Sequence, residues 1–249
     1  MRYNIFRSLL FSIRAFGLWR GLHLPVYVCA PVRVVNMGRI EVDGPLRRGM
    51  IILGMNSNDT TAPCSIWDNR GTVRVHGRMW LHHGCRLHNE GTVEFGRGVI
   101  ISHNCVLDIY ERLTFGDNVS VGYGSEFMDT DIHFMVDVAS RQVRRNTAPI
   151  RIGDFNWLGS HTYVKKGSVT PRGIIVASPN GVLLRDYTSD VPPYSILGGQ
   201  PARIIGQGKR RVLNHQHEME LRRALHVDEC VTLPDTLDLD EYCALKGLE

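Results

Sequence analysis

The chain has 249 residues, 43% of them apolar, which is enough for one large domain with a continuous core. Its 29 Lys and Arg against 25 Asp and Glu leave a formal charge of only +4, and without a basic cluster or a known motif this argues against nucleic acid as a partner. The six cysteines form no CxxC pair, so we expect free thiols in a reducing, cytoplasmic compartment.

Residues 1–30 have the pattern of a basic amphipathic helix, with apolar side chains set between arginines. The arginines interrupt the apolar run every few positions, so the segment does not read as a membrane span, and it lacks the cleavage pattern of a signal peptide. Two roles stay open. The helix can cap the end of the domain that follows, or it can attach the chain peripherally to the inner surface of an anionic membrane.

Self-similar segments come next along the chain. The sequence GTVRVHG at 71–77 recurs as GTVEFG at 91–96, and a related GRIEVDG lies at 38–44. At an offset of 20 residues, large apolar residues align in three series, which identifies a repeat architecture. The three series are Val75, Phe95 and Phe115; Leu81, Ile101 and Val121; and Trp67, Leu87, Leu107 and Phe127.

Six residues supply one short strand and one corner, so three such units close a triangular coil with its large apolar residues pointing inward. Four smaller residues are expected to pack inward near the corners: Cys85, Cys105, Val119 and Ser125. We therefore predict an all-β fold, a parallel β-helix over 31–207, with an N-terminal helical cap at 1–30 and a C-terminal helical tail at 208–249.

The period is interrupted once and then returns. The second series of predicted core positions is Ile152, Leu158, Val164, Thr170, Val176 and Val182. Between the two series, 129–149 is a polar and basic stretch without a repeat. A long excursion from a solenoid is usually functional or disordered, and its place beside regular coils favours a functional loop.

Three further motifs are IGDFNWLGS at 152–160, DVPPYS at 190–195 and GGQPARII at 198–205. In this order, after a run of hexapeptides, they resemble the hexapeptide-repeat acyltransferases, and most closely the sugar and polysaccharide O-acetyltransferases. The resemblance covers roughly residues 73–205. It implies a left-handed coil, a homotrimer, and active sites in clefts between subunits that move an acetyl group from acetyl-coenzyme A to a hydroxyl of a saccharide, such as a cell-surface glycan or its precursor.

The expected reaction needs a base for the hydroxyl proton and donors for the tetrahedral oxyanion. In the resembling enzymes that base is a histidine on the loop excursion, upstream of the motif tryptophan. His133, in DTDIH at 129–133, lies 24 residues before Trp157 and matches it. Asp131, or Asp129, is close enough in sequence to orient the imidazole and stabilise its charged form.

The resemblance assigns six residues to acetyl-coenzyme A: Trp157, Ser160, Ala177, Ser178, Arg185 and Arg203. Ser160 would contact the pantetheine arm near the thioester, and Arg203 matches a basic residue that meets coenzyme phosphate. Leu184 falls where the family carries a lysine, so Arg185 replaces that lysine only after a register shift. No metal is implied.

The acceptor leaves fewer signals in the sequence. Asp108 is an alternative partner for the base, and Asp108 and Asn104 are our candidates for holding the acceptor sugar. Neither residue identifies that sugar, because fold does not determine substrate.

Two rival functions are compatible with the same fold. His83, His88 and His103 could supply three imidazoles to a zinc site, as in hexapeptide carbonic anhydrases. A non-catalytic solenoid that only binds a partner or a glycan is the other rival. The tail does not separate these functions: 215–225 has helical spacing, and 231–248 mixes acidic residues with Leu and Tyr.

Overall fold

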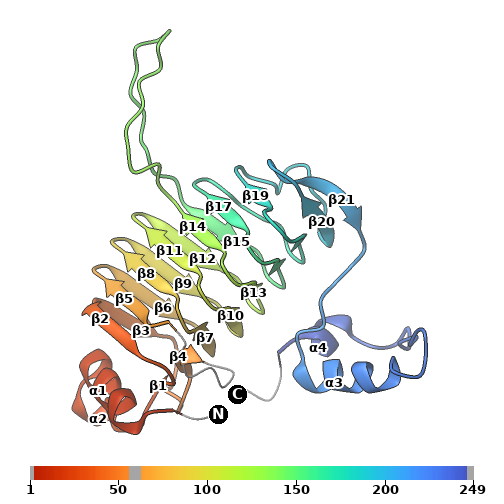
Figure 1. The fold of residues 1–249 in the computed structure, drawn as a ribbon, viewed down its shortest axis with the longest axis horizontal. Helices are drawn as coiled ribbons and strands as arrows, with labels where there is room; N and C mark the ends of the chain where they lie inside the picture. Colours follow the sequence, from red (N-terminus) through yellow and green to blue (C-terminus); the bar gives the residue numbers. More distant parts are fainter. Residues whose placement is uncertain (1–2, 56–62, 246–249) are drawn as a thin grey trace.

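The computed structural model describes residues 3–55 and 63–245, and most of them wind into a parallel β-helix with three sheets (Figure 1). The nine-stranded sheet contains, in spatial order, β1 (Val26–Val28), β4 (Ile51–Met55), β7 (Met79–His82), β10 (Val99–Ile101), β13 (Ser120–Val121), β16 (Trp157–Leu158), β18 (Ile175–Val176), β20 (Ser195–Gly198) and β21 (Arg203–Gln207). The seven-stranded sheet contains β2 (Val32–Asn36), β5 (Ser65–Asn69), β8 (Arg86–Asn89), β11 (Val106–Ile109), β14 (Glu126–Met128), β17 (Tyr163–Lys165) and β19 (Val182–Leu183). The five-stranded sheet contains β3 (Arg39–Val42), β6 (Thr72–Val75), β9 (Thr92–Phe95), β12 (Arg112–Phe115) and β15 (Ile150–Ile152).

The register of these sheets confirms the repeat. Val75 pairs with Phe95, and Phe95 pairs with Phe115, so the offset of 20 residues is one turn of the coil. The two other series pair in the same way. All of these side chains are buried, and the rings of Phe95 and Phe115 stack with centroids 5.5 Å apart. Each contributes about 1.5–3 kcal/mol of transfer free energy, so the stack inside the coil is the core of the domain.

The predicted corner residues are also buried. Cys85 and Cys105 occupy equivalent positions in successive coils and are free thiols. The thiol of Cys85 donates to the carbonyl of Ser102 at 3.0 Å, and that of Cys105 donates to the carbonyl of Gly122 at 3.2 Å. These contacts explain both cysteines as packed core residues.

One predicted core position is wrong. Val164 pairs with Leu183, which is fully buried, whereas Val182 pairs with Tyr163 and is only half-buried. The turn between β18 and β19 carries one residue more than the six-residue step allows. The inward face therefore shifts by one position.

Two helices close the first coil. α1 (Ile5–Phe16) begins at Asn4, whose side chain accepts from the backbone N–H of Arg7, and α2 (Leu18–Gly21) follows directly. Phe11 packs edge-on against the core residue Trp67, with ring centroids 5.5 Å apart. Figure 1 shows both helices against β1, where they cover the end of the coil.

The excursion at 129–149 is an arm that leaves the coil between β14 and β15 (Figure 1). Its two halves lie antiparallel, with bridges between Thr130 and Thr147 and between Val136 and Val143. The next coil then resumes in register, because β15 pairs with β12.

The C-terminal tail contains α3 (His215–Ala224) and α4 (Leu239–Cys243). Asp240 of α4 forms ion pairs with Arg172 on the coil and with Arg210. The backbone N–H of Leu245 donates to the side chain of Asn118 at 2.9 Å, so the tail packs along the coil. Among the described residues, no helix combines the length and the apolarity that a bilayer-spanning segment requires.

Candidate active site

His133 lies near the base of the arm, and its side chain is exposed. Its backbone N–H donates to the carbonyl of Asp131 at 2.6 Å, in a tight turn where Ile132 has a positive φ of 62°. The imidazole itself makes no hydrogen bond to any residue that the structure describes. It opens onto a cavity of about 370 Å³ whose other polar lining includes Asn146 and Lys166. The ring is therefore free to meet a substrate hydroxyl.

Neither predicted orienting carboxylate contacts the His133 ring. Asp131 forms an ion pair with Lys166, which follows β17 one coil further along. Asp131 reaches His133 only through its main-chain carbonyl. This arrangement fixes the turn that carries the histidine rather than the histidine's tautomer.

Asp129 is fully buried and serves the backbone. Its carboxylate accepts from the N–H groups of Tyr110, Glu111 and Arg112 at 2.7–2.8 Å, at the corner between β11 and β12. Burial raises the pKa of Asp129, and the three N–H donors oppose that shift. Asp129 therefore anchors the first residue of the arm to the coil below it, and the structure does not place it as a catalytic group.

Three of the six residues predicted to contact the coenzyme, Ser160, Ala177 and Ser178, lie on successive coils at one corner, where the nine-stranded sheet turns into the seven-stranded sheet. Ser160 follows β16, and Ala177 and Ser178 follow β18. The hydroxyl of Ser178 donates to the carbonyl of Ser160 at 3.1 Å, so the structure brings these two residues together. Their own backbone N–H groups have no acceptor within the described part of the chain. Two free N–H groups on one edge can serve as donors to a developing oxyanion.

Trp157 begins β16 and is 37% exposed. The guanidinium of Arg211, from the segment leading into the tail, lies 4.8 Å from its ring centroid and also contacts the Ser120 hydroxyl. Burial lowers the pKa of Arg211. Trp157 is therefore partly covered by a residue that the sequence did not indicate.

The two predicted phosphate-binding arginines differ. Arg203 begins β21, is exposed, and has no ion-pair partner among the described residues. Arg185 makes a two-pronged ion pair with Asp190 at 2.7 and 2.8 Å and lies over the Tyr187 ring. Arg203 is free to meet a ligand, whereas Arg185 would first have to leave Asp190.

The two candidate acceptor residues do not share a position. Asn104 occupies the turn between β10 and β11 with a positive φ of 57°, at the same corner as Ser160 but earlier in the coil. Asp108 lies on β11, and its Oδ1 is buried without a hydrogen bond. The Oδ1 atom of Asp108 is thus shielded from solvent, whereas the side chain of Asn104 is exposed.

The predicted base and the serines predicted to contact the coenzyme lie at different corners of one chain. His133 follows a strand of the seven-stranded sheet, whereas Ser160 and Ser178 precede strands of the same sheet. The length of a strand therefore separates them.

Sequence reasoning missed Lys166, which pairs with Asp131. The signal was present, because Phe127 and Val164 pair in neighbouring coils and this register puts Lys166 beside the start of the arm. Arg145 was also missed; it forms an ion pair with Glu111 at 3.2 Å and holds the returning half of the arm.

Histidines gather at the corner that carries Ser160. The rings of His83, His103 and Tyr123 stack in parallel at centroid distances of 5.2 and 5.0 Å, and His161 meets Tyr123 edge-on at 4.8 Å. This ladder puts His161 in the same turn as Ser160, which makes it the alternative base.

The rival zinc site is not assembled within one chain. His88 lies on β8, and its Nδ1 is 3.1 Å from the carboxylate of Asp68. Across 3–55 and 63–245, no three His, Cys, Asp or Glu side chains are placed to hold a common metal ion.

His82 lies beside the stacked rings of His83 and His103, and we expect it to make the stability of the fold sensitive to acid. Burial lowers its pKa to about 4, helped by His103 and His83. Between pH 6.5 and 4 the unfolded chain binds a proton that the folded chain refuses, so stability falls as pH falls through this window. When the pH is lowered from 7 to 4.5, the free energy of unfolding of His82→Gln should fall by about 2 kcal/mol less than that of the parent chain. This difference corresponds to about 4–8 °C in Tm. Thermal unfolding at both pH values measures this, with exposed His226→Gln as the control; equal acid sensitivity in all three proteins would refute it.

Comparison with known proteins finds similar curated proteins and similar solved structures. No protein-family model matches the chain. The probable acetyltransferase Rv3034c of Mycobacterium tuberculosis is 27% identical over 182 residues, which are 70% of this chain and 56% of that protein. The chain thus spans little more than half the length of this relative.

Among solved structures, the polySia-specific acetyltransferase NeuO aligns over 86% of this chain and 91% of its own, with a TM-score of 0.51 and 16% identity. AntD, an N-acyltransferase from Bacillus cereus, aligns over 81% of this chain and 88% of its own, with a TM-score of 0.46 and 15% identity. At this identity the likeness to NeuO shows the fold. The predicted fold class is confirmed: the chain is an all-β, left-handed parallel β-helix of the kind found in hexapeptide-repeat acyltransferases.

Proposed function

We propose that the chain is an acetyl-coenzyme A-dependent O-acetyltransferase that acts on a hydroxyl of a saccharide, such as a cell-surface glycan or its precursor. The observation that carries the proposal is the chemistry of two corners of the coil, one with His133 and the other with Ser160 and Ser178. One presents an unpaired imidazole on an arm, and the other presents two free N–H groups, while exposed Arg203 begins β21 at the end of the sheet that contains β16 and β18. The similarity to a probable acetyltransferase and the fold shared with a polySia-specific acetyltransferase support the same reaction class.

In the proposed mechanism, His133 accepts the proton of the acceptor hydroxyl as its oxygen attacks the thioester carbonyl. The N–H groups of Ser160 and Ser178 donate to the oxyanion that forms. Collapse of the tetrahedral intermediate breaks the carbon–sulfur bond and releases the coenzyme thiolate, which takes the proton from the His133 imidazolium. Arg203 would hold a coenzyme phosphate. The products are the acetylated saccharide and free coenzyme A.

The mechanism requires two chains at each site, and we propose a homotrimer. The separation of His133 from Ser160 within one chain supports this. A closed ring of three copies would bring three such pairs of corners together through one repeated interface. An acetyl-coenzyme A donor also favours the cytoplasm as the place of reaction.

Coenzyme A should stabilise the folded protein. At about 100 times its Kd the gain is about 2.7 kcal/mol, so Tm should rise by about 5–10 °C. Arg203→Ala should need roughly 10 times more ligand for the same rise, because a charged phosphate contact is lost. Arg185→Ala should change the required coenzyme A concentration less, since Asp190 already binds the Arg185 guanidinium.

Thermal shift titration, followed by transfer of label from acetyl-coenzyme A to a panel of glycans, tests the proposal. Exposed Arg222→Ala in the tail is the matched control. Absence of any coenzyme A shift would favour a non-catalytic solenoid. A thermal shift with coenzyme A but no transfer of label to any glycan would support coenzyme A as the ligand and contradict a saccharide as the acceptor.

A further inference from the structure

The N-terminal helix α1 carries large apolar side chains on both faces: Phe11 is buried against the coil, whereas Phe6 and Leu10 are exposed. The face against the coil carries Ser8 and Ser12, both fully buried. The Ser8 hydroxyl accepts from the N–H of Val28 at 2.9 Å, and the Ser12 hydroxyl accepts from the N–H of Val26 at 3.2 Å. Hydroxyls thus satisfy the free edge of β1, where an aliphatic face would leave these N–H groups without acceptors.

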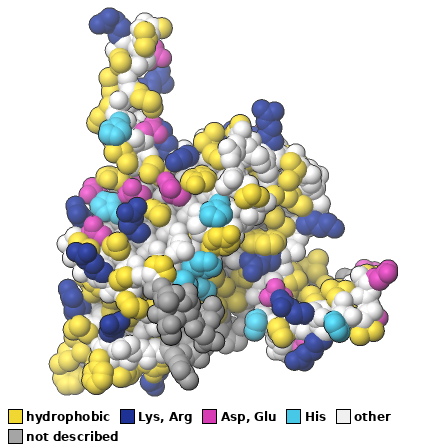
Figure 2. Space-filling view, in the orientation of Figure 1, with side chains coloured by type: hydrophobic (Ala, Val, Ile, Leu, Met, Phe, Trp, Pro, Cys, Tyr) yellow, Lys and Arg dark blue, Asp and Glu magenta, His cyan; other side chains and the backbone are white. Residues whose placement is uncertain are grey.

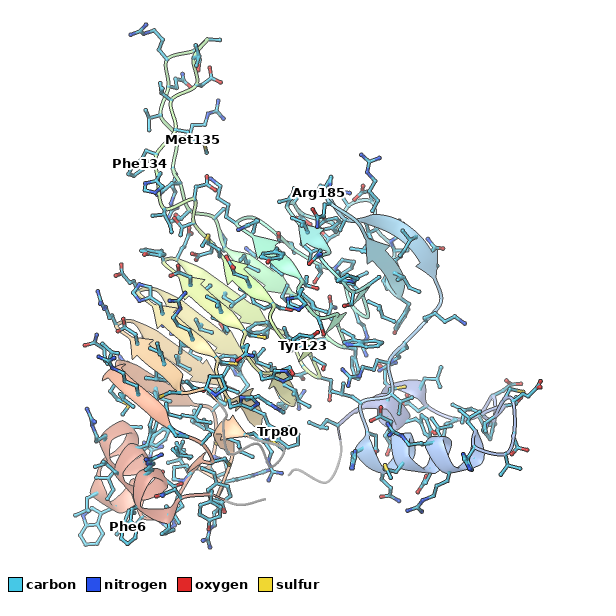
Figure 3. The ribbon with its side chains drawn as sticks, in the orientation of Figure 1. Phe6, Trp80, Tyr123, Phe134, Met135 and Arg185 are labelled. Atoms are coloured by element: carbon cyan, nitrogen blue, oxygen red, sulfur yellow. The ribbon has the colours of Figure 1, made fainter. Side chains whose placement is uncertain are left out.

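The outward face of α1 and α2 is a large apolar surface. Phe6 is 81% exposed and Trp19 is 79% exposed. Leu10, Leu18 and Leu22 are each at least half exposed. Figure 2 shows the apolar side chains gathered over these helices, and Figure 3 shows Phe6 pointing away from the coil. We call this surface, with Ile5, the N-terminal apolar face.

The charge around this face has one sign. The first 40 residues contain six arginines and no Asp or Glu; the first acidic residue is Glu41. Arg7, Arg14 and Arg33 line a groove of about 330 Å³ between α1 and β2, which Leu10 also lines. Exposed Arg20 stands beside Trp19.

We propose that the N-terminal apolar face binds the surface of an anionic phospholipid bilayer. Exposed Phe, Trp and Leu side chains beside arginines are the pattern of helices that lie in the headgroup region, where apolar groups enter the acyl boundary and cations meet lipid phosphates. A second copy of the chain fits this surface poorly. A symmetric contact would bring arginines against arginines with no carboxylate between them.

The proposed attachment leaves the candidate active site free. The face lies at the end of the coil, and β13, which precedes the arm, is four strand spacings from β1. At about 4.8 Å for each spacing, the arm starts roughly 19 Å along the axis from the attached end. The bilayer would therefore hold the chain by its first coil and leave the corners open.

The test is sedimentation of the full chain with vesicles of phosphatidylcholine alone and of phosphatidylcholine mixed with phosphatidylglycerol. We expect binding to the mixed vesicles and little binding to the neutral ones. The combined change Phe6→Ser, Leu10→Ser and Trp19→Ser should weaken binding at least about 100-fold. Arg7→Gln with Arg14→Gln should weaken it about 10-fold or more at low salt and remove the preference for phosphatidylglycerol.

Matched controls come from the tail. Val227→Ser changes an 85% exposed apolar residue, and Arg222→Gln with Arg223→Gln removes two exposed charges; both should bind like the parent chain. Failure of the parent chain to sediment with mixed vesicles would overturn the proposal. So would full binding by the serine variant, or sedimentation velocity showing that this variant mainly loses self-association. The coenzyme A thermal shift without vesicles should be unchanged in every variant, which separates this test from that of the proposed function.

Discussion

Replacing His133 by alanine should lower turnover by about 10²–10⁴-fold while leaving coenzyme A affinity unchanged, because the base is lost and the coenzyme corner is intact. The imidazole is exposed and makes no hydrogen bond in the described chain, so its removal costs the fold little. Steady-state kinetics at saturating donor and acceptor, together with the coenzyme A thermal shift, measure the two effects separately. His161→Ala is the control, since His161 shares its turn with Ser160.

Near-normal turnover of His133→Ala together with a large loss of turnover in His161→Ala would identify His161 as the base.

A second experiment tests whether the site is shared between chains. Mixed oligomers of His133→Ala and Ser160→Tyr chains should regain activity at about one site in four, because some sites then combine an intact His133 with an intact Ser160 from another chain. No recovery in confirmed mixed oligomers would mean that both groups act from one chain.

The core could be predicted from sequence because the coil repeats. A fixed offset forces equivalent residues of successive turns onto one another, so the series through Phe95 and through Leu107 follow from counting alone. Counting a fixed number of residues per turn gives the wrong core position where a corner contains an extra residue, as before Leu183, since the length of a turn depends on its local bend. The cysteine positions were predicted for the same reason as the core.

The candidate site was less accessible to sequence because its contacts join different coils. Asp129 and Asp131 are near His133 in the chain, yet one binds backbone N–H groups of the preceding coil and the other pairs with Lys166 of the following coil. Proximity in sequence therefore predicted the wrong partners. The amphipathic pattern of the N-terminal segment was also insufficient to predict which residues face the coil. The pattern predicted a helix, but the residues that face the coil include Ser8 and Ser12, because the exposed edge of β1 needs acceptors.

Loss of the Asp129 carboxylate should destabilise the fold more than any other single change considered for this chain. Asp129→Ala leaves the N–H groups of Tyr110, Glu111 and Arg112, at a partly buried corner of the coil, without their acceptor. Each unsatisfied donor costs about 1–3 kcal/mol, so we expect a loss of about 3 kcal/mol or more and a fall in Tm of at least about 6–12 °C.

Thermal and urea unfolding measure this loss, and two further variants define its cause. Asp129→Asn keeps one acceptor oxygen and should lose less than the alanine variant. Asp137→Ala removes an exposed carboxylate from the outer part of the same arm, where it accepts from the N–H and hydroxyl of Ser140, and should lower the free energy of unfolding less than Asp129→Ala does. If Asp129 instead orients the base, Asp129→Asn should unfold like the parent chain and lose turnover. Because all three acceptor distances lie between 2.7 and 2.8 Å and the carboxylate is fully buried, we expect the unfolding measurement to separate the variants.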